Sequence, residues 1–229
     1  MKYMGSKARI AKEILPIILK DRKPEQYYVE PFCGGCNMID KVANPRIAND
    51  IHPQLIALLK ALSDGWEPPR EISEEQYIDC KKNQNKYDPV YVGYVGFCLS
   101  YSGKWWGGYA RDKAGKRNYG LEAYKNLLNQ QPLLKDIEFH NRNYYDLDIP
   151  HNSIIYCDPP YFGTTKYKNS FDNDKFWCWC ERQVKIGNRV FVSEYQAPNT
   201  WRCVWQKEIT SSLTQDTGSK KAIERLFTL

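Results

Sequence analysis

Short runs of apolar residues, broken by turn residues, recur along the chain and predict strands rather than long helices. The runs are rich in β-branched and aromatic side chains, which suit a pleated, half-buried surface. Five of them are predicted to be strands: 27–30, 46–50, 137–141, 153–157 and 190–193. Residues 201–209 and 222–229 alternate between polar and apolar positions, which predicts a closing hairpin.

Between these runs, apolar residues recur at the spacing of a helix. Helices are predicted over 6–19, 37–42, 53–62, 73–82, 121–128 and 174–185. Pro16 is expected to bend or split the first helix, and the polar segments 163–171 and 210–221 are expected to be loops. Strands and helices that alternate in this way predict an α/β fold, with a mostly parallel sheet covered by helices on both faces.

The strand at 153–157 ends abruptly in Asp158, Pro159, Pro160 and Tyr161. Proline has no N–H for a strand ladder and restricts the residue before it, so this stretch of backbone is expected to be stiff. Its polar groups would lie at the carboxyl end of a strand, where open α/β sheets bind ligands. Asp158 and the Pro159 carbonyl can accept the two hydrogens of an amino group, and Tyr161 can stack on a flat base. An ordinary surface turn is the alternative.

A second candidate site is the glycine-rich turn after the strand at 27–30. Gly34 and Gly35 permit positive φ and the close approach of a ligand. The turn does not match the Gly-x-x-x-x-Gly-Lys-Ser/Thr pattern, so a nucleoside triphosphate is not expected. Asp50 ends the next strand some 15 residues later, close to the spacing at which an acid meets ribose hydroxyls. It would also suit a cap for the helix that follows.

Residues 61–135 break this pattern and predict an insertion into one domain formed by 1–60 and 136–229. The segment 101–120 within it is rich in glycine, with interleaved basic and aromatic residues, and is poor core material. It is expected to lie on double-stranded DNA, and a solvated surface loop is the alternative. The cations that would contact the DNA are Lys104, Arg111, Lys113, Lys116 and Arg117.

The net charge of +6 and the pI of about 8.8 are compatible with a polyanionic partner. No apolar run approaches the roughly 20 residues that cross a bilayer, and the N-terminal residues lack the apolar stretch of a signal peptide. We therefore expect a cytoplasmic protein.

Eight cysteines are scattered along the chain and are expected to be small core residues. Cys33 and Cys36 have the Cys-x-x-Cys spacing of a redox or zinc site. Since no second such pair and no His-x-x-x-His follows, a metal is not expected.

Four motifs together resemble the Dam-like (alpha-group) DNA adenine methyltransferases, including those of phages: Tyr3 to Lys7, Glu30 to Gly35, Asn49-Asp50 and Asp158 to Tyr161. The resemblance spans most of the chain. It implies a Rossmann-like methyltransferase with an antiparallel edge hairpin, in which 61–135 is a small, mainly helical target-recognition insertion. It also implies methylation of the exocyclic amine of a flipped-out adenine, with S-adenosylmethionine as donor and S-adenosylhomocysteine as product.

The same resemblance implies which residues hold the methyl donor. Tyr3 would pack near its methionine end, Lys7 would meet its carboxylate, and Asp50 would bind its ribose. Asn143 and Tyr144 would flank its adenine, although the family often has an acid in place of Asn143. The loop around the donor would comprise Glu30, Pro31, Phe32, Cys33, Gly34 and Gly35, and Asp158 would lie beside it.

Other reactions remain open at this point. The same acceptors would serve the exocyclic amine of cytosine, although Asp158 as the first residue of its motif and the order of the motifs favour adenine. Methylation of a cytosine carbon needs a cysteine nucleophile, usually in a Pro-Cys pair, which this sequence lacks. An inactive DNA-binding relative is a further alternative, against which Asp50 and Asp158 weigh. A glutamine methyltransferase is a weaker possibility, since that family has Asn at position 158.

Overall fold

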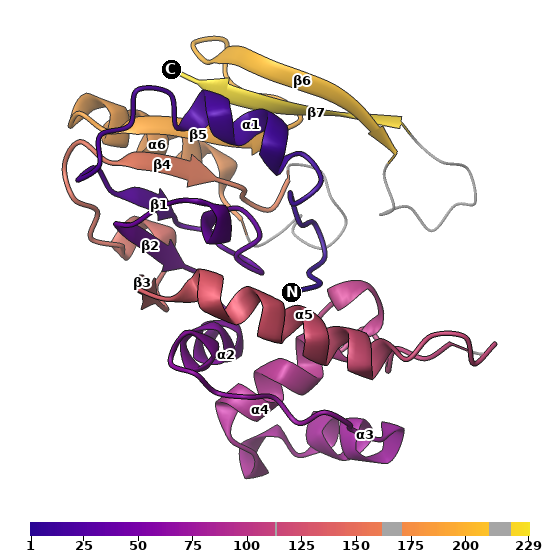
Figure 1. The fold of residues 1–229 in the computed structure, drawn as a ribbon. Helices are drawn as coiled ribbons and strands as arrows, with labels where there is room; N and C mark the ends of the chain where they lie inside the picture. The colour runs from indigo at the N-terminus through magenta and orange to yellow at the C-terminus, as the bar shows by residue number, and fades with distance from the viewer. Residues whose placement is uncertain (113, 162–170, 211–220) are drawn as a thin grey trace.

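A seven-stranded sheet forms the centre of the molecule (Figure 1). The computed structural model describes residues 1–112, 114–161, 171–210 and 221–229, so most of the predicted loops 163–171 and 210–221 lie outside the described residues. The strands are β1 Tyr28–Glu30, β2 Arg46–Asn49, β3 Ile137–His140, β4 Ile154–Cys157, β5 Arg189–Glu194, β6 Arg202–Thr210 and β7 Lys221–Thr228.

The strands lie in the order β3-β2-β1-β4-β5-β7-β6. Strands β1 to β5 run parallel, β7 is antiparallel to β5, and β6 is antiparallel to β7. The predicted parallel sheet with an antiparallel edge hairpin is therefore confirmed.

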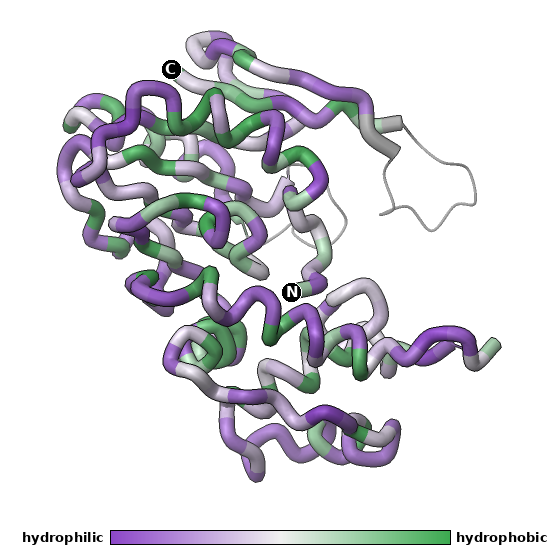
Figure 2. The backbone as a smooth tube through the Cα atoms, viewed as in Figure 1, coloured by the Kyte–Doolittle hydropathy of each residue, from purple (hydrophilic) through white to green (hydrophobic). Residues whose placement is uncertain are grey.

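Helices bury both faces of this sheet, and the strand residues alternate between them. In β4, Ile154 and Tyr156 belong to the cluster that includes the buried side of α1, whereas Ile155 and Cys157 pack with α6. All four residues of β4 are buried, which explains why the strand is a continuous apolar run. Figure 2 shows apolar residues along the central strands.

The α-helices are α1 Ala11–Ile18, α2 Pro53–Ser63, α3 Glu74–Lys82, α4 Pro89–Gly93, α5 Tyr119–Leu134 and α6 Asn173–Lys185. Helix α1 begins five residues later than predicted, and Pro16 lies inside it without ending it. The helix predicted at 37–42 is wrong, since only the single 3₁₀ turn η1 Ile39–Lys41 forms there. Cys36, just before this segment, has a φ of 55°, which lies outside the right-handed helical region.

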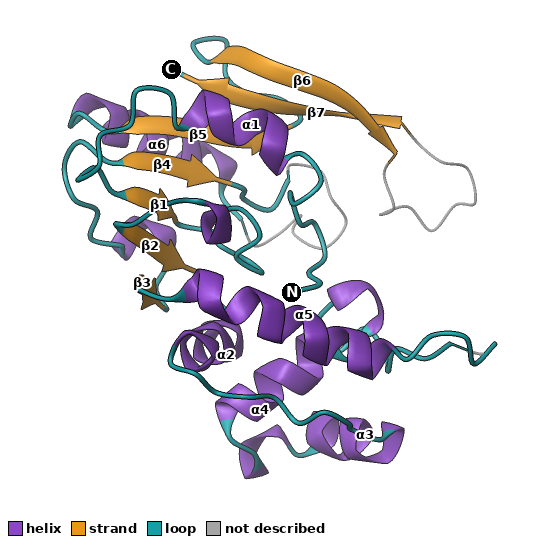
Figure 3. Cartoon of the chain, viewed as in Figure 1, coloured by secondary structure: helices purple, strands orange, loops and turns teal. Residues whose placement is uncertain are grey.

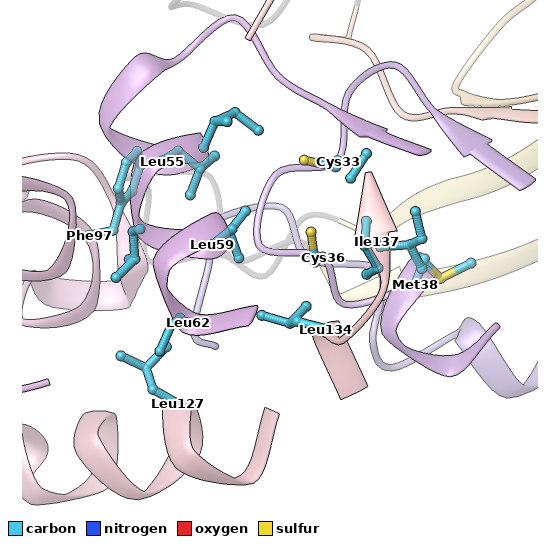
Figure 4. Close-up of a cluster of buried hydrophobic side chains, with 14 of the residues drawn as sticks. Cys33, Cys36, Met38, Leu55, Leu59, Leu62, Phe97, Leu127, Leu134 and Ile137 are labelled. Carbon is cyan, nitrogen blue, oxygen red and sulfur yellow. The ribbon is translucent and has the colours of Figure 1, made fainter. Parts of the chain in front are cut away.

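Helices α2 to α5 gather beyond the β3 edge of the sheet (Figure 3). Their buried residues join those of one sheet face in a single cluster. Figure 4 shows Leu59 and Leu62 of α2 between Leu127 of α5 and the loop residue Cys36. The predicted boundary at residue 60 falls within α2, so the insertion 61–135 shares its core with the rest of the chain.

One feature of the insertion was not predicted from the sequence, and another differs from the prediction. Residues 94–98 continue α4 as a π-helical turn, η3 Tyr94–Cys98. Helix α5 extends from Tyr119 to Leu134, well past the predicted end at residue 128. It continues because Gln130, which looks like a loop residue in the sequence, is buried and hydrogen-bonded on the inner face of the helix.

Candidate active site

The candidate site forms where the parallel strands β1, β2 and β4 end. These strands lie side by side in register, so their carboxyl ends meet at one edge of the sheet. The glycine loop follows β1, Asp50 follows β2, and Asp158 follows β4. The sheet thus gathers at one edge three motifs that are far apart in the sequence.

Asp158 is held by a lysine from the N-terminal segment. The Nζ atom of Lys7 lies 2.8 Å from Oδ1 and 3.0 Å from Oδ2 of Asp158. The same Nζ is 3.4 Å from a carboxylate oxygen of Glu224 in β7 and 4.6 Å from the centre of the Tyr161 ring. The Tyr161 hydroxyl donates a hydrogen bond to Glu224. Lys7 therefore lies between two carboxylates and against the aromatic ring of the motif.

Burial and neighbouring charges have opposite effects on the pKa values of Asp158 and Lys7. Burial raises the pKa of Asp158, and the Lys7 ammonium opposes that rise. Burial alone would lower the pKa of Lys7, but Asp158 and Glu224 together outweigh it and raise that pKa. The ammonium of Lys7 is therefore the main group that favours the ionised form of Asp158, with a smaller contribution from the Tyr161 hydroxyl.

Tyr161 packs against another aromatic side chain. Its ring meets that of Tyr195 edge to face, with centroids 4.7 Å apart and an angle of 85°. Burial raises the pKa of the Tyr161 phenol well above its ordinary value, so it is a hydrogen-bond donor at neutral pH. Of the two prolines, Pro159 is buried and Pro160 is half-buried.

The N-terminal segment packs directly on the glycine loop. A Cβ atom on Gly34 would lie 2.7 Å from a ring carbon of Tyr3, and one on Gly35 would lie 2.7 Å from the Cβ of Tyr3. Gly34 also has a φ of 47°. These glycines are therefore required by the approach of Tyr3 as well as by the turn.

Below this loop, Glu30 is buried and accepts a hydrogen bond of 2.9 Å from the Tyr28 hydroxyl. Burial raises the pKa of Glu30 well above its usual range. Pro31 and Cys33 are buried, whereas Phe32 is partly exposed. Among the predicted loop residues, Phe32 and Gly34 thus have exposed surface for a ligand, whereas Gly35 and Glu30 are buried.

Asp50 is fixed by backbone donors on both of its oxygens. Its Oδ2 accepts from the Gly34 N–H at 3.1 Å, and its Oδ1 accepts from the His52 N–H at 3.0 Å. Burial raises the pKa of Asp50, while these backbone donors oppose the rise. The next residue, Ile51, is 67% exposed. Asp50 thus ties the glycine loop to the start of α2, and an apolar side chain lies beside it.

A buried asparagine at the end of β2 joins the loops after β1 and β3, and no separate role was predicted for it from the sequence. Asn49 donates to the carbonyl of Pro31 at 2.9 Å and to that of Arg142 at 3.0 Å, and it accepts from the Arg142 N–H at 3.0 Å. The signal in the sequence was a polar side chain at the end of an otherwise apolar strand.

The two residues predicted beside the cofactor adenine differ in exposure. Asn143 is partly exposed, just before the short helix η5 Tyr144–Asp146. Tyr144 is buried, and its ring centre lies 5.2 Å from that of Phe32 and 5.3 Å from that of Trp179. In this arrangement the Tyr144 ring supports Phe32 from the core.

Of the predicted DNA-binding cations, the four that the structure describes are exposed, but two of them are paired. Arg111 forms a salt bridge of 2.6 Å with Glu74, and Arg117 forms one of 2.8 Å with Glu122. Within the part of the chain that the structure describes, no salt bridge engages Lys104 or Lys116. Lys113 lies outside the described residues.

Helix α5 also contacts the glycine loop from inside the core. Gln130 donates to the Gly35 carbonyl at 3.0 Å and to the Asp40 carboxylate at 2.9 Å. It is one of two contacting residues that the sequence analysis missed, the other being Glu224. In β7, Glu224 shares a face with Leu226, which is buried, and an acid on an apolar strand face is the signal that could have revealed it.

The described residues form neither a metal site nor a membrane-spanning helix. No group of three or more His, Cys, Asp or Glu side chains is arranged to hold a metal ion there. No helix in the same residues has the length and apolar character needed to cross a membrane.

Comparisons with known proteins give the family. Two solved structures cover 96% of this chain: TrmN from Thermus thermophilus, with 11% identity and a TM-score of 0.41, and SMU.472 complexed with SAH, with 13% identity and a TM-score of 0.38. The match covers 48% and 52% of those chains, so this chain spans about half their length. The family model of the D12 class N6 adenine-specific DNA methyltransferases matches residues 3–178, which contain Lys7, the glycine loop, Asp50 and Asp158. The chain belongs to this D12 class of N6 adenine-specific DNA methyltransferases.

Proposed function

We propose that this protein transfers a methyl group from S-adenosylmethionine to the exocyclic amine of adenine in double-stranded DNA. The observation that carries the proposal is the position of Asp158, Pro159 and Tyr161 at the same sheet edge as the glycine loop and Asp50. Membership of the D12 class supports the choice of adenine over cytosine.

The groups at this edge fit the methyl donor. Asp50 supplies a fixed carboxylate for the ribose hydroxyls, and the exposed Ile51 beside it offers an apolar face to the adenine ring. Phe32 and Tyr3 would line the other parts of the site, and Asn143 would hydrogen-bond to an edge of the adenine. When bound, S-adenosylmethionine supplies a methyl group on a positively charged sulfur.

Lys7 would have two tasks in this site. It contacts both oxygens of Asp158, and its ammonium would also neutralise the carboxylate of the donor. A carboxylate has about four lone-pair positions. Asp158 can therefore accept a hydrogen of the substrate amine while keeping one contact with Lys7.

The substrate amine would be held by the motif after β4. Asp158 and the Pro159 carbonyl would accept its two hydrogens, which favours a more tetrahedral nitrogen with a freer lone pair. Tyr161 would stack on the base. Since an amine inside a duplex cannot reach this edge, the base must be flipped out, at a cost of a few kcal/mol that stacking offsets in part. Positioning then supplies much of the rate acceleration.

The insertion would bind the DNA. Lys104 and Lys116 are exposed and free of salt bridges to other described residues, so they are the cations most directly available to phosphates. Arg111 and Arg117 would have to share their guanidinium groups with Glu74 and Glu122. Tyr101, 66% exposed and close to Lys104 in the chain, offers an additional aromatic surface.

The test is to incubate duplex DNA with the protein and S-adenosylmethionine, digest the DNA to nucleosides and identify the modified one. We expect N6-methyladenine with the wild type and none with Asp158→Ala, provided that both bind the donor in calorimetry. N4-methylcytosine as the product, or equal product from Asp158→Ala, would overturn the proposal.

A further inference from the structure

A carboxylate from the end of the chain completes the candidate site. Glu224 lies in β7, outside the residues 3–178 that match the family model. Since β7 runs antiparallel to β5, with Glu194 opposite Arg225, its first residues reach the edge where the parallel strands end. Glu224 is 3% exposed. A buried acid in this position needs partners, because an isolated buried carboxylate is costly.

Both partners of Glu224 are residues of the candidate site. Its carboxylate lies 3.4 Å from the Nζ atom of Lys7 and accepts a hydrogen bond from the Tyr161 hydroxyl. One side chain therefore fixes the ammonium that contacts Asp158 and also the ring that would stack on the base.

The charges of this cluster do not balance. Lys7 brings one positive charge, and Asp158 and Glu224 bring two negative charges when both are ionised. Asp158 alone would neutralise Lys7, so Glu224 is not required for neutrality. The excess negative charge lies beside the position proposed for the substrate amine.

We propose that Glu224 is a positioning residue for methyl transfer: it holds Lys7 and Tyr161 in place and keeps the site negative where the amine becomes positively charged. This inference rests on the proposed function. In the transfer, the lone pair of the amine forms the new N–C bond while the C–S bond breaks and its electrons stay on sulfur. The nitrogen then carries a positive charge until its extra proton leaves to water.

A fixed negative charge acts most strongly on the state in which that positive charge develops, so it accelerates the step. Glu224 also gives Lys7 a second carboxylate to contact when the substrate amine takes one lone-pair position of Asp158. Both effects require the charge of Glu224, while its hydrogen bond with Tyr161 requires only an acceptor oxygen.

The decisive variant is therefore Glu224→Gln, which keeps the size and an acceptor oxygen but removes the charge. We expect the single-turnover rate of methyl transfer to duplex DNA, at saturating S-adenosylmethionine, to fall about tenfold or more, somewhat less than for loss of a direct contact. Donor affinity in calorimetry and the melting temperature should stay close to wild type. Glu224→Asp, which keeps the charge, should be faster than Glu224→Gln.

The pH profile separates this role from simple packing. The ionisable groups that act on Asp158 are Lys7, Glu224 and the buried Glu30 of β1, with Tyr161 as a neutral donor. Glu224 raises the pKa of Asp158, so Glu224→Gln should move the acid limb of the rate to lower pH while lowering the rate on the plateau. Glu25→Gln is the matched control, since Glu25 is exposed in the loop before β1 at the opposite edge of the sheet.

The same assay distinguishes failure of the Glu224 inference from failure of the proposed function. If wild type methylates adenine and Glu224→Gln does so at the same rate, the role of Glu224 is overturned and the proposed function stands. A loss of rate that merely follows a loss of donor binding and of melting temperature would also overturn it. If wild type methylates no adenine in the same assay, the proposed function itself fails, and the inference about Glu224 fails with it.

Discussion

The Lys7 ammonium and the Asp158 carboxylate, 151 residues apart in the chain, meet at 2.8 Å. Their side chains are 11% and 21% exposed, so the pair is only partly screened by water. This contact fixes the N-terminal segment against the end of β4. Tyr3, four residues before Lys7, packs on the glycine loop after β1. The first residues of the chain thus connect the two halves of the candidate site.

Removing Lys7 should shift the pH dependence of methyl transfer. Burial raises the pKa of Asp158 and Lys7 lowers it, so in Lys7→Met the carboxylate keeps its proton to higher pH. We expect the acid limb of the single-turnover rate, measured at saturating donor, to move to higher pH than in wild type. Lys12→Met, at an exposed position of α1, is the control. An acid limb that stays in place would contradict the pairing.

A methyl group on Gly34 should disrupt the site through Tyr3. Its Cβ would lie 2.7 Å from the Tyr3 ring, and its φ is 47°. We expect Gly34→Ala to lower the free energy of unfolding by about 1–3 kcal/mol and to weaken donor binding. Gly65→Ala, where φ is 96° but no atom lies within 4 Å of the new Cβ, isolates the backbone strain. Combining Gly34→Ala with Tyr3→Ala should recover part of the lost free energy of unfolding. If the effects of the two substitutions on that free energy simply add, the result would argue against the contact.

Reversing the charge of Arg117 should weaken DNA binding and leave donor binding intact. Arg117→Glu removes an exposed cation and places an acid beside Glu122. If Arg117 contacts a phosphate, the slope of log affinity against log salt should fall in magnitude by about one. The companion variant Glu122→Gln frees Arg117 and should bind DNA at least as tightly as wild type. Equal losses of DNA and donor affinity in Arg117→Glu would count against a DNA role.

Gln130 should matter to the glycine loop although it lies in the insertion. Gln130→Ala removes a donor to the Gly35 carbonyl and a donor to the buried Asp40 carboxylate, which keeps its contact with Lys41; the loss costs about 1–3 kcal/mol. We expect a lower melting temperature together with weaker donor binding. Asn129→Ala, at the exposed neighbouring position of α5, should change neither. A Gln130→Ala protein with wild-type stability would show that these hydrogen bonds contribute little.

Local sequence patterns were sufficient to predict the features that depend on a single strand or turn. The strand before Asp158 is buried on both faces, so its apolar run identified β4 directly. Three further features could be recognised in the same way, because each needs particular residue types at a fixed local spacing: the Asp158–Tyr161 motif, the glycine turn and Asp50. The topology of the sheet then placed them at one edge, as a mostly parallel α/β fold requires.

The features that were not predicted from the sequence depend on tertiary contacts. The helix predicted from residue 6 starts at Ala11, because Lys7 reaches Asp158 from a turn instead. The polar end of α5 looked like a loop because the sequence does not show that Gln130 has buried partners. Glu224 was missed since only the position of β7 next to β5 brings it to the site.

The place of β7 between β5 and β6 has a consequence for the living cell. The ribosome makes β6 first and β7 afterwards, so a nascent chain lacks an interior strand of the sheet until the β7 segment emerges. Glu224 belongs to that segment, and therefore the acidic cluster around Lys7 forms only when translation of this region is over. A prematurely terminated product would be left with an unpaired β5 edge, prone to association with other chains, and without the charge proposed to speed its chemistry.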